Sequence, residues 1–165
     1  MTATRNRHGS ATVTLPSDTE ILITRQFDAP AALVFKATTT PELVKRWWGF
    51  ESSEWLVCEI DLRVGGSWRY VTREANGYEV GFHGEYREIA APTRLVTTEV
   101  FEGFPDAGAL NTMTLVEKDG VTTMTTLVQH TIREHRDAHI NSGMEGGMQV
   151  SFNRLEDVVS GLGVA

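Results

Sequence analysis

The middle of the sequence holds strand-like segments joined only by short turns, and this feature constrains the fold most strongly. Residues favouring strands occupy 54–64, 67–74, 78–89, 95–101 and 110–131. Gly65-Gly66, "ANG", "APTR" and Asp119-Gly120 punctuate these segments as turns. Parallel strands need a crossover of about a dozen residues or more, whereas short turns join antiparallel neighbours. The sequence therefore predicts a meandering antiparallel sheet.

Helical patterns lie on both sides of this region. A strand-like stretch from Thr12 to Phe27, broken at "PSD", precedes two short helical segments that carry Pro30 and Pro41 near their starts. A helical tail begins near Arg133 and continues to the end of the sequence. The order predicts an α+β protein, with about six or seven strands and one long C-terminal helix.

Length and charge limit the possible domain organisation and the possible binding partners of the protein. The 165 residues suit a single domain, predicted over 12–165, and the polar residues 1–11 are predicted to form a mobile leader. A net charge of −7 argues against nucleic acid or an anionic membrane surface as the main partner, and no apolar run is long enough to span a membrane. The single cysteine, Cys58, precludes an intrachain disulfide, and we expect a cytoplasmic protein with Cys58 as a small buried apolar residue.

The C-terminal helix carries glycine where helices usually avoid it. In "SGMEGGMQVSFNRLEDVVSG", Met144, Gly147 and Met148 share one face with the apolar residues that follow, and Ser142 and Glu145 have the spacing of a capping box. Small and flexible side chains leave space between this helix and a sheet, and methionine adapts to variable ligands. The glycines are equally compatible with close helix–sheet contact, so the residues alone leave both interpretations open.

Aromatic and methionine side chains are the candidates for lining a pocket. Trp68 and Tyr70 share a strand face, as do Phe82 and Tyr86, and only one of the adjacent Trp47 and Trp48 can face inward. The same residue types also build ordinary cores. The predicted ligand-binding residues are Trp47, Trp48, Trp68, Tyr70, Phe82, Tyr86, Met113, Met124, Met144, Gly147 and Met148.

Only a small number of polar residues are candidates for a catalytic or metal-binding role. Glu99 lies between apolar residues of a strand, and it is a candidate acid or base if it points inward, or a plain surface group if it does not. His135 and His139 have metal-ligand spacing on a helix, but no third ligand is in register, and we expect them on a solvated surface. No nucleophile triad, phosphate loop or cysteine cluster is present, so neither a metal nor a cofactor is predicted.

Four stretches, taken in order, resemble one family. They are "ITRQFDAPAALVFKATTTPELVKRWWG", "EIDLRVGGSWRY", "GEYREIAAPTRLVTTEVF" and "INSGMEGGMQVSFNRLEDVV". The sequence is similar to the activator of heat-shock protein 90 ATPase homologue family, within the START-like (SRPBCC) superfamily. The resemblance implies a helix-grip fold, in which a curved antiparallel sheet wraps a long C-terminal helix and leaves a cavity between them.

The function expected from residues and resemblance together is binding of a hydrophobic or aromatic small molecule between sheet and helix. One alternative is an enzyme of the polyketide cyclase or aromatase type, found elsewhere in the superfamily, which would need Glu99 together with Tyr70, Tyr86 or His83 inside the cavity. The other alternative is a chaperone co-regulator, as the family's namesake implies. Exposed apolar residues also allow a homodimer.

Overall fold

The computed structural model describes residues 11–163, which form one antiparallel sheet with helices against it. The sheet has eight strands in the order β1-β2-β8-β7-β6-β5-β4-β3, so the α+β prediction is confirmed with slightly more strands than expected. The described residues contain no helix long and apolar enough to cross a membrane. The strands are β1 (Thr12–Thr14), β2 (Glu20–Phe27), β3 (Glu54–Ile60), β4 (Ser67–Arg73), β5 (Glu79–Ala90), β6 (Arg94–Phe101), β7 (Ala109–Lys118) and β8 (Val121–His130).

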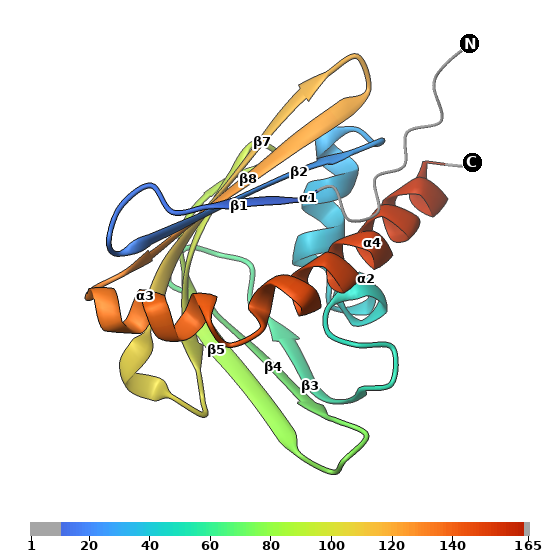
Figure 1. Cartoon of the computed structure of the whole chain (residues 1–165). Helices are drawn as coiled ribbons and strands as arrows, with labels where there is room; N and C mark the ends of the chain where they lie inside the picture. The colour runs from blue at the N-terminus through green and yellow to red at the C-terminus, as the bar shows by residue number, and fades with distance from the viewer. Residues whose placement is uncertain (1–10, 164–165) are drawn as a thin grey trace.

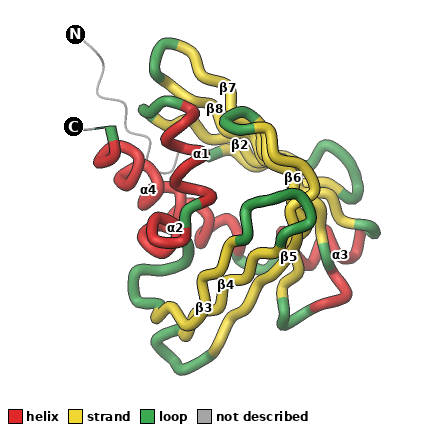
Figure 2. Tube along the Cα trace, turned by 180° about the vertical axis from the view of Figure 1, so that it is seen from behind, coloured by secondary structure: helices red, strands yellow, loops and turns green. Residues whose placement is uncertain are grey.

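The helices gather on one face of the curved sheet. The longest, α4, runs across this face, with α1 and α2 beside its C-terminal half (Figure 1). Seen from behind, α3 lies at the far end of the sheet from α1 and α2 (Figure 2). This arrangement confirms the helix-grip fold. The bounds are α1 (Ala31–Thr39), α2 (Pro41–Trp47), α3 (Arg133–Ile140), α4 (Met144–Leu162) and a short 3-10 helix, η1 (Pro105–Ala107).

The predicted C-terminal tail is two helices and not one. Gly143 separates them with φ of 84°, a left-handed conformation that glycine adopts at little cost. The predicted capping box is wrong, because α4 has no side-chain cap and the Ser142 hydroxyl donates backward to the His139 carbonyl at 2.6 Å. Glycine conformation, and not serine capping, therefore sets the start of α4.

The inner face of the sheet, defined as the face toward α4, carries the main core. Alternation along the strands turns Phe27, Tyr86 and Leu115 inward, where they join Leu155 and Val159 of α4 in one buried cluster. This packing involves the C-terminal half of α4. The N-terminal half contributes no fully buried side chain, so the helix is firmly packed at one end only.

A buried ion pair fixes the packed half of α4 to β2. The Arg25 side chain is fully buried, and its Nη1 lies 3.2 Å from Glu156 Oε1. Asn153 Oδ1 accepts a hydrogen bond from Arg25 Nη2, and the other oxygen of Glu156 accepts one from the Asp28 backbone N–H, each at 3.2 Å. The Arg25 guanidinium also lies 4.7 Å from the centre of the Phe27 ring. Several polar contacts thus hold helix and strand in one relative position.

The side chain of Trp68 passes over β5 at Gly84. Its indole Nε1 donates to the Thr98 carbonyl of β6 at 3.2 Å, passing over Gly84. A Cβ on Gly84 would lie 1.8 Å from that carbonyl oxygen and 2.7 Å from Trp68 Nε1. The Trp68 indole occupies the room that the absence of a side chain at Gly84 leaves.

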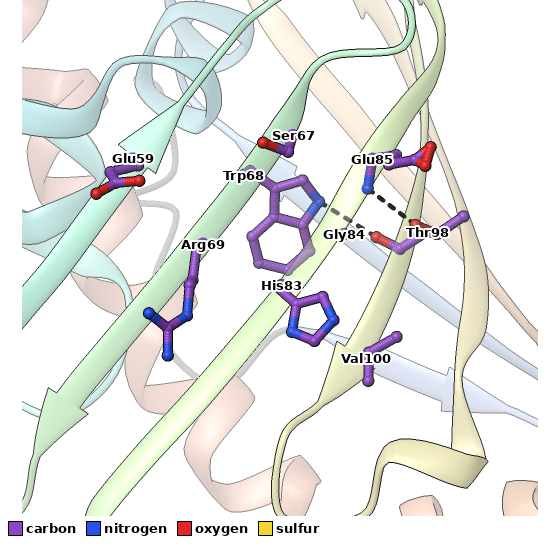
Figure 3. A pocket seen from close by; sticks show the side chains of 9 residues that line it. All are labelled: Glu59, Ser67, Trp68, Arg69, His83, Gly84, Glu85, Thr98 and Val100. Carbon is purple, nitrogen blue, oxygen red and sulfur yellow. Dashed lines mark hydrogen bonds between the residues drawn. The ribbon is translucent and has the colours of Figure 1, made fainter.

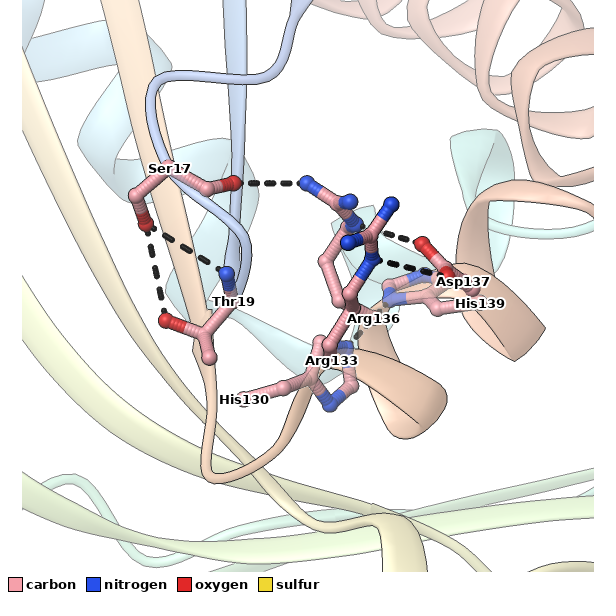
Figure 4. A network of polar contacts seen from close by, with 7 residues as sticks. All are labelled: Ser17, Thr19, His130, Arg133, Arg136, Asp137 and His139. Atoms are coloured by element: carbon pink, nitrogen blue, oxygen red, sulfur yellow. Dashed lines mark hydrogen bonds and ion pairs between the residues drawn. The ribbon is translucent and has the colours of Figure 1, made fainter.

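The helix α3 is docked on the end of the sheet by histidine and arginine side chains (Figure 4). His130 Nε2 of β8 and His139 Nδ1 of α3 are 3.0 Å apart, and the buried Arg136 donates to the Ser17 carbonyl at 2.6 Å. The expectation that His135 and His139 lie on a solvated face is therefore wrong for His139. Among residues 11–163, no group of three or more histidine, cysteine or acidic side chains is placed to hold a metal.

Burial keeps these histidines neutral. Desolvation above all, together with repulsion from the nearby His139, His135 and Arg136, lowers the pKa of His130 to about 4. Desolvation also lowers the pKa of His139. An uncharged pair can share one N–H···N hydrogen bond, whereas two imidazolium rings at this distance would repel one another.

We expect acid to weaken the docking of α3. A histidine whose folded pKa is depressed leaves stability intact above its unfolded value of about 6.5, and stability is lost as pH falls from there toward the folded value. Urea midpoints measured from pH 7 to 4.5 should fall, and His130→Gln should make that fall shallower. Identical pH profiles for parent and variant would show that His130 has no part in the effect.

We expect Gly84→Ala to destabilise the protein by about 2 kcal/mol or more, because the new methyl group meets a backbone carbonyl that cannot move freely. Gly146→Ala is the matched control. Nothing lies within 4 Å of a Cβ there, and alanine is the better helix former by about 1 kcal/mol. Chemical denaturation compares the two, and equal midpoints would contradict the packing described for Trp68.

Candidate functional site

A pocket of about 420 Å³ opens on the outer face of the sheet, away from α4 (Figure 3). Arg69 and His83, two of its lining residues, are already paired with Glu102. Glu102 accepts hydrogen bonds from Arg69 at 2.9 and 3.0 Å, and its Oε2 lies 2.8 Å from His83 Nδ1. These contacts, Arg69 above all, lower the pKa of Glu102 to about 2. The pocket is lined by Glu59, Ser67, Trp68, Arg69, His83, Gly84, Glu85, Thr98 and Val100.

The inner face offers a different chemistry, an aromatic surface with few polar groups. Tyr70 lies at its centre, with ring centroids of Trp68 and Trp48 at 4.7 and 5.3 Å and that of Trp55 at 5.8 Å. Phe82 extends the surface from Trp48, at 5.3 Å. Edge-on and tilted contacts of this kind hold rings rigidly. We take this aromatic surface and the polar groups beside it as the candidate functional site.

The two adjacent tryptophans of the "RWWG" segment have separate roles. Trp47 is buried in the core, where its Nε1 donates to the Ala37 carbonyl of α1 at 2.9 Å. Trp48 ends α2 in extended conformation, which turns its ring toward Tyr70 and Phe82 on the sheet. The end of the helix thus separates the two side chains.

Glu99 lies on the inner face, and not on the outer one. In β6 it alternates with Thr98 and Val100, which line the outer pocket, and it pairs with the buried Ala109 of β7. Burial raises the pKa of Glu99 above its ordinary value, while a hydrogen bond from the Asn111 side chain opposes this shift. A carboxyl group in this position is poised to exchange a proton or to bind a hydrogen-bond donor.

Other polar groups lie near this carboxyl. Asn111 Oδ1 is buried and has no hydrogen-bond partner among the described residues. Burial raises the pKa of Tyr70 well above its ordinary value, with smaller contributions from Tyr86, Cys58 and Glu99. Burial likewise raises the pKa of Tyr86. Both phenols are therefore protonated near neutral pH and are hydrogen-bond donors.

Space lies in front of the glycines of α4. A Cβ on Gly147 would meet only Phe50 Cζ, at 3.7 Å, which is ordinary contact, and a Cβ on Gly146 would meet nothing within 4 Å. The interpretation of these glycines as sites of close contact with the sheet is therefore excluded at these positions. Phe50 itself is 48% exposed and stands at the edge of this space.

The remaining predicted residues divide between core and site. Met113 and Met124 are buried in the main core beneath the packed half of α4. Met144 and Met148 pack on a smaller cluster that includes Ile21 of β2. His83 is on the outer face with Glu102 and cannot act with Glu99. Cys58 is half-buried on β3, where burial raises the pKa of its thiol to about 11.

Three residues of the site were not predicted from the sequence. Asn111 lies two residues before Met113 on β7 and shares its face, so its inward position is readable from strand periodicity once the strand is recognised. Trp55 precedes a register shift between β3 and β4, which breaks the alternation and hides its packing on Trp48. Phe50 lies in a loop, and no periodic signal places it.

Known structures share this architecture. A protein from Rhodobacter sphaeroides is 24% identical over 92% of this chain and 99% of its own, with a TM-score of 0.84. Protein Ms6760 from Mycobacterium smegmatis is 24% identical over 90% of this chain and 96% of its own, with a TM-score of 0.80. DynU16, from the dynemicin biosynthetic locus, is 20% identical over 88% of this chain and 48% of its own, with a TM-score of 0.68. At these identities the likeness establishes the fold alone.

Comparison of sequences identifies the family. No curated protein matches the chain. The family described as "Activator of Hsp90 ATPase homolog 1-like protein" matches residues 28–160, which is most of the sequence and includes the aromatic surface and all but the last two residues of α4. The chain belongs to this family of activator of Hsp90 ATPase homologue 1-like proteins, with a START-like helix-grip fold.

Proposed function

We propose that the protein binds an apolar or aromatic small molecule between the inner face of the sheet and the N-terminal half of α4. The observation that carries this proposal is the open space at Gly147, on the helix that runs across the face of the sheet that bears the aromatic surface. A helix that needed only to complete a core would present large side chains there, as its own C-terminal half does with Leu155 and Val159. Flat aromatic rings favour stacking with a flat or apolar ligand.

The partial exposure of the aromatic residues supports the same function. Trp48, Trp55 and Phe82 are each only partly buried, although they pack against the core. Apolar surface that a folded protein leaves accessible and concave gains free energy when a ligand covers it, by roughly 25 cal/mol for each Å². The site thus has a driving force for binding that does not require a metal or a covalent bond.

Gly147→Leu should fill this space. Leucine is a better helix former than glycine, and its side chain has no close neighbour to displace, so we expect a variant at least as stable as the parent. Its affinity for the neutral solvatochromic dye Nile red should fall about tenfold or more, measured by fluorescence titration. Thermal melts of the same samples report stability.

Gly146→Leu is the matched control for that experiment. It brings the same gain in helix propensity, but Gly146 is exposed and its side chain position has no neighbours. Dye binding should therefore stay at the parent level. A destabilised Gly147→Leu, or equal dye affinity in all three proteins, would show that the space is not a ligand site.

A second candidate function is proton transfer on a bound carbonyl compound, as in a cyclase-type enzyme. Glu99 and Tyr70 favour it, because a carboxyl group of raised pKa lies close enough to a protonated phenol to influence its ionisation. Such a pair can remove a proton from carbon while the phenol donates to the developing enolate oxygen. The expected partner His83 is excluded from this role by its position on the outer face.

We expect this activity to appear as enzyme-dependent exchange of the acidic C–H protons of an aromatic β-diketone into deuterated water, followed by NMR. Glu99→Gln should abolish the exchange above the buffer rate and Tyr70→Phe should slow it. Glu85→Gln, a carboxylate of the outer face, is the control that should leave the exchange unchanged. Exchange at the buffer rate in the parent protein, with the compound shown to bind, would eliminate this candidate.

The chaperone role implied by the family description is the remaining alternative. We do not propose it, because no contact or surface of the described residues specifically favours it. Co-purification with the host's chaperone, with and without ATP, would bring it back into consideration.

A further inference from the structure

The carboxyl group of Glu99 has no cationic partner in the part of the chain that the structure describes. The ion pairs among residues 11–163 all involve other acidic side chains, such as Glu102 with Arg69 and Glu156 with Arg25. The group that contacts Glu99 is the neutral Asn111 amide. A buried carboxylate without a counter-ion is costly, and a positive charge beside it would remove that cost.

The surroundings of Glu99 suit a cation in a second way. Trp68 hydrogen-bonds to the residue preceding Glu99, and Tyr70 is close enough for its ionisation to be influenced by the carboxylate. Trp48 and Phe82 continue the same surface. The faces of tryptophan and tyrosine rings attract ammonium groups within about 6 Å, so these rings and the carboxylate favour the same kind of ligand atom.

The unpaired side-chain oxygen of Asn111 further limits the class of ligand that the site can bind. The Asn111 side chain donates to Glu99, which leaves Oδ1 as a buried acceptor without a donor among the described residues. An ammonium group with two or more N–H bonds can donate to Glu99 and to Asn111 Oδ1 together. A hydroxyl group has a single O–H and satisfies one of these acceptors, while a quaternary ammonium group satisfies neither by hydrogen bonding.

We propose that the inner site selects aromatic or apolar ligands that carry a primary or secondary ammonium group, and that Glu99 and Asn111 bind that group. This inference rests on the proposed function, because it names the class of ligand for the same site. The ring system of the ligand lies on Trp48, Tyr70 and Phe82, and its charged nitrogen is directed toward β6 and β7. The charged nitrogen replaces the counter-ion that the protein itself lacks there.

A matched pair of ligands tests the proposal. Nile red is bound first, and 2-naphthylmethylamine and 2-naphthalenemethanol then compete for it at pH 7.5. Both competitors have the same ring system and nearly the same size. We expect the amine to bind at least tenfold more tightly than the alcohol, and the N,N,N-trimethyl derivative of the amine to bind more weakly than the amine itself.

Variants test which residues produce the preference for the amine over the alcohol. Glu99→Gln should retain Nile red binding but equalise the amine and the alcohol, and Asn111→Leu should reduce the preference severalfold. Glu85→Gln on the outer face should keep it in full. A preference that survives in Glu99→Gln would overturn the proposal, since it would then arise from the overall charge of −7.

The parent protein alone also decides the matter if the variants do not fold. A preference for the amine that persists in 0.5 M NaCl supports a partly buried pair, whereas one that disappears in salt reflects surface charge and refutes the proposal. Equal binding of amine and alcohol, with Nile red bound, refutes the ligand class and leaves the proposed function standing. Failure of every compound, Nile red included, refutes the proposed function itself.

Discussion

The buried contact between Arg25 and Glu156 determines how the rest of the molecule is arranged. A buried ion pair contributes little net stability, because desolvation offsets most of the attraction. The attraction nevertheless depends strongly on the relative position of the two charges. Here it fixes one turn of α4 over one position of β2, and Asn153 and Asp28 add hydrogen bonds at the same place. Any shift of the helix along the sheet would separate these charges. The position of the helix is therefore set from its C-terminal half.

This anchoring explains why α4 is asymmetric. Its anchored half buries Leu155, Val158 and Val159, which supply the apolar packing expected of a core helix. The N-terminal half of α4 continues the same rigid helix and needs no tight packing of its own. Ser151 and Arg154, near the middle of α4, bind the Gly49 carbonyl at 3.3 and 2.9 Å, so polar contacts join the middle of the helix to the loop that follows Trp48. A site between helix and sheet can thus exist without cost to the core.

The sequence predicted those parts of the structure that depend on local periodicity and turn chemistry. The strands, the short helices and the shared face of Trp68 and Tyr70 all follow from alternation and from glycine or proline at the turns. The break at Gly143 was missed because the helical pattern continues across it. The contact of His139 with His130 joins two elements, and no local pattern encodes it. The side on which Glu99 lies remained open for the same reason, since it depends on the pairing of β6 with β7.

The site was partly predictable for a related physical reason. Aromatic residues on recognised strands could be assigned to a face, whereas Trp55 beside a register shift and Phe50 in a loop could not. Trp47 and Trp48 show the limit clearly. Their adjacency indicated that they must diverge, but which ring turns inward depends on where α2 ends, and a helix end is the least certain feature of a sequence-based prediction.

The separation of α4 into a packed half and an open half has an evolutionary consequence. Substitutions at Gly146 or Gly147 alter the volume and shape of the space beside the aromatic surface, yet they leave Leu155, Val159 and the Arg25–Glu156 contact untouched. Most changes to a binding pocket are constrained because the same residues also hold the fold together. In this architecture the two tasks fall on different turns of one helix. Under the proposed function, ligand preference can therefore diversify by single amino-acid changes that folding does not oppose.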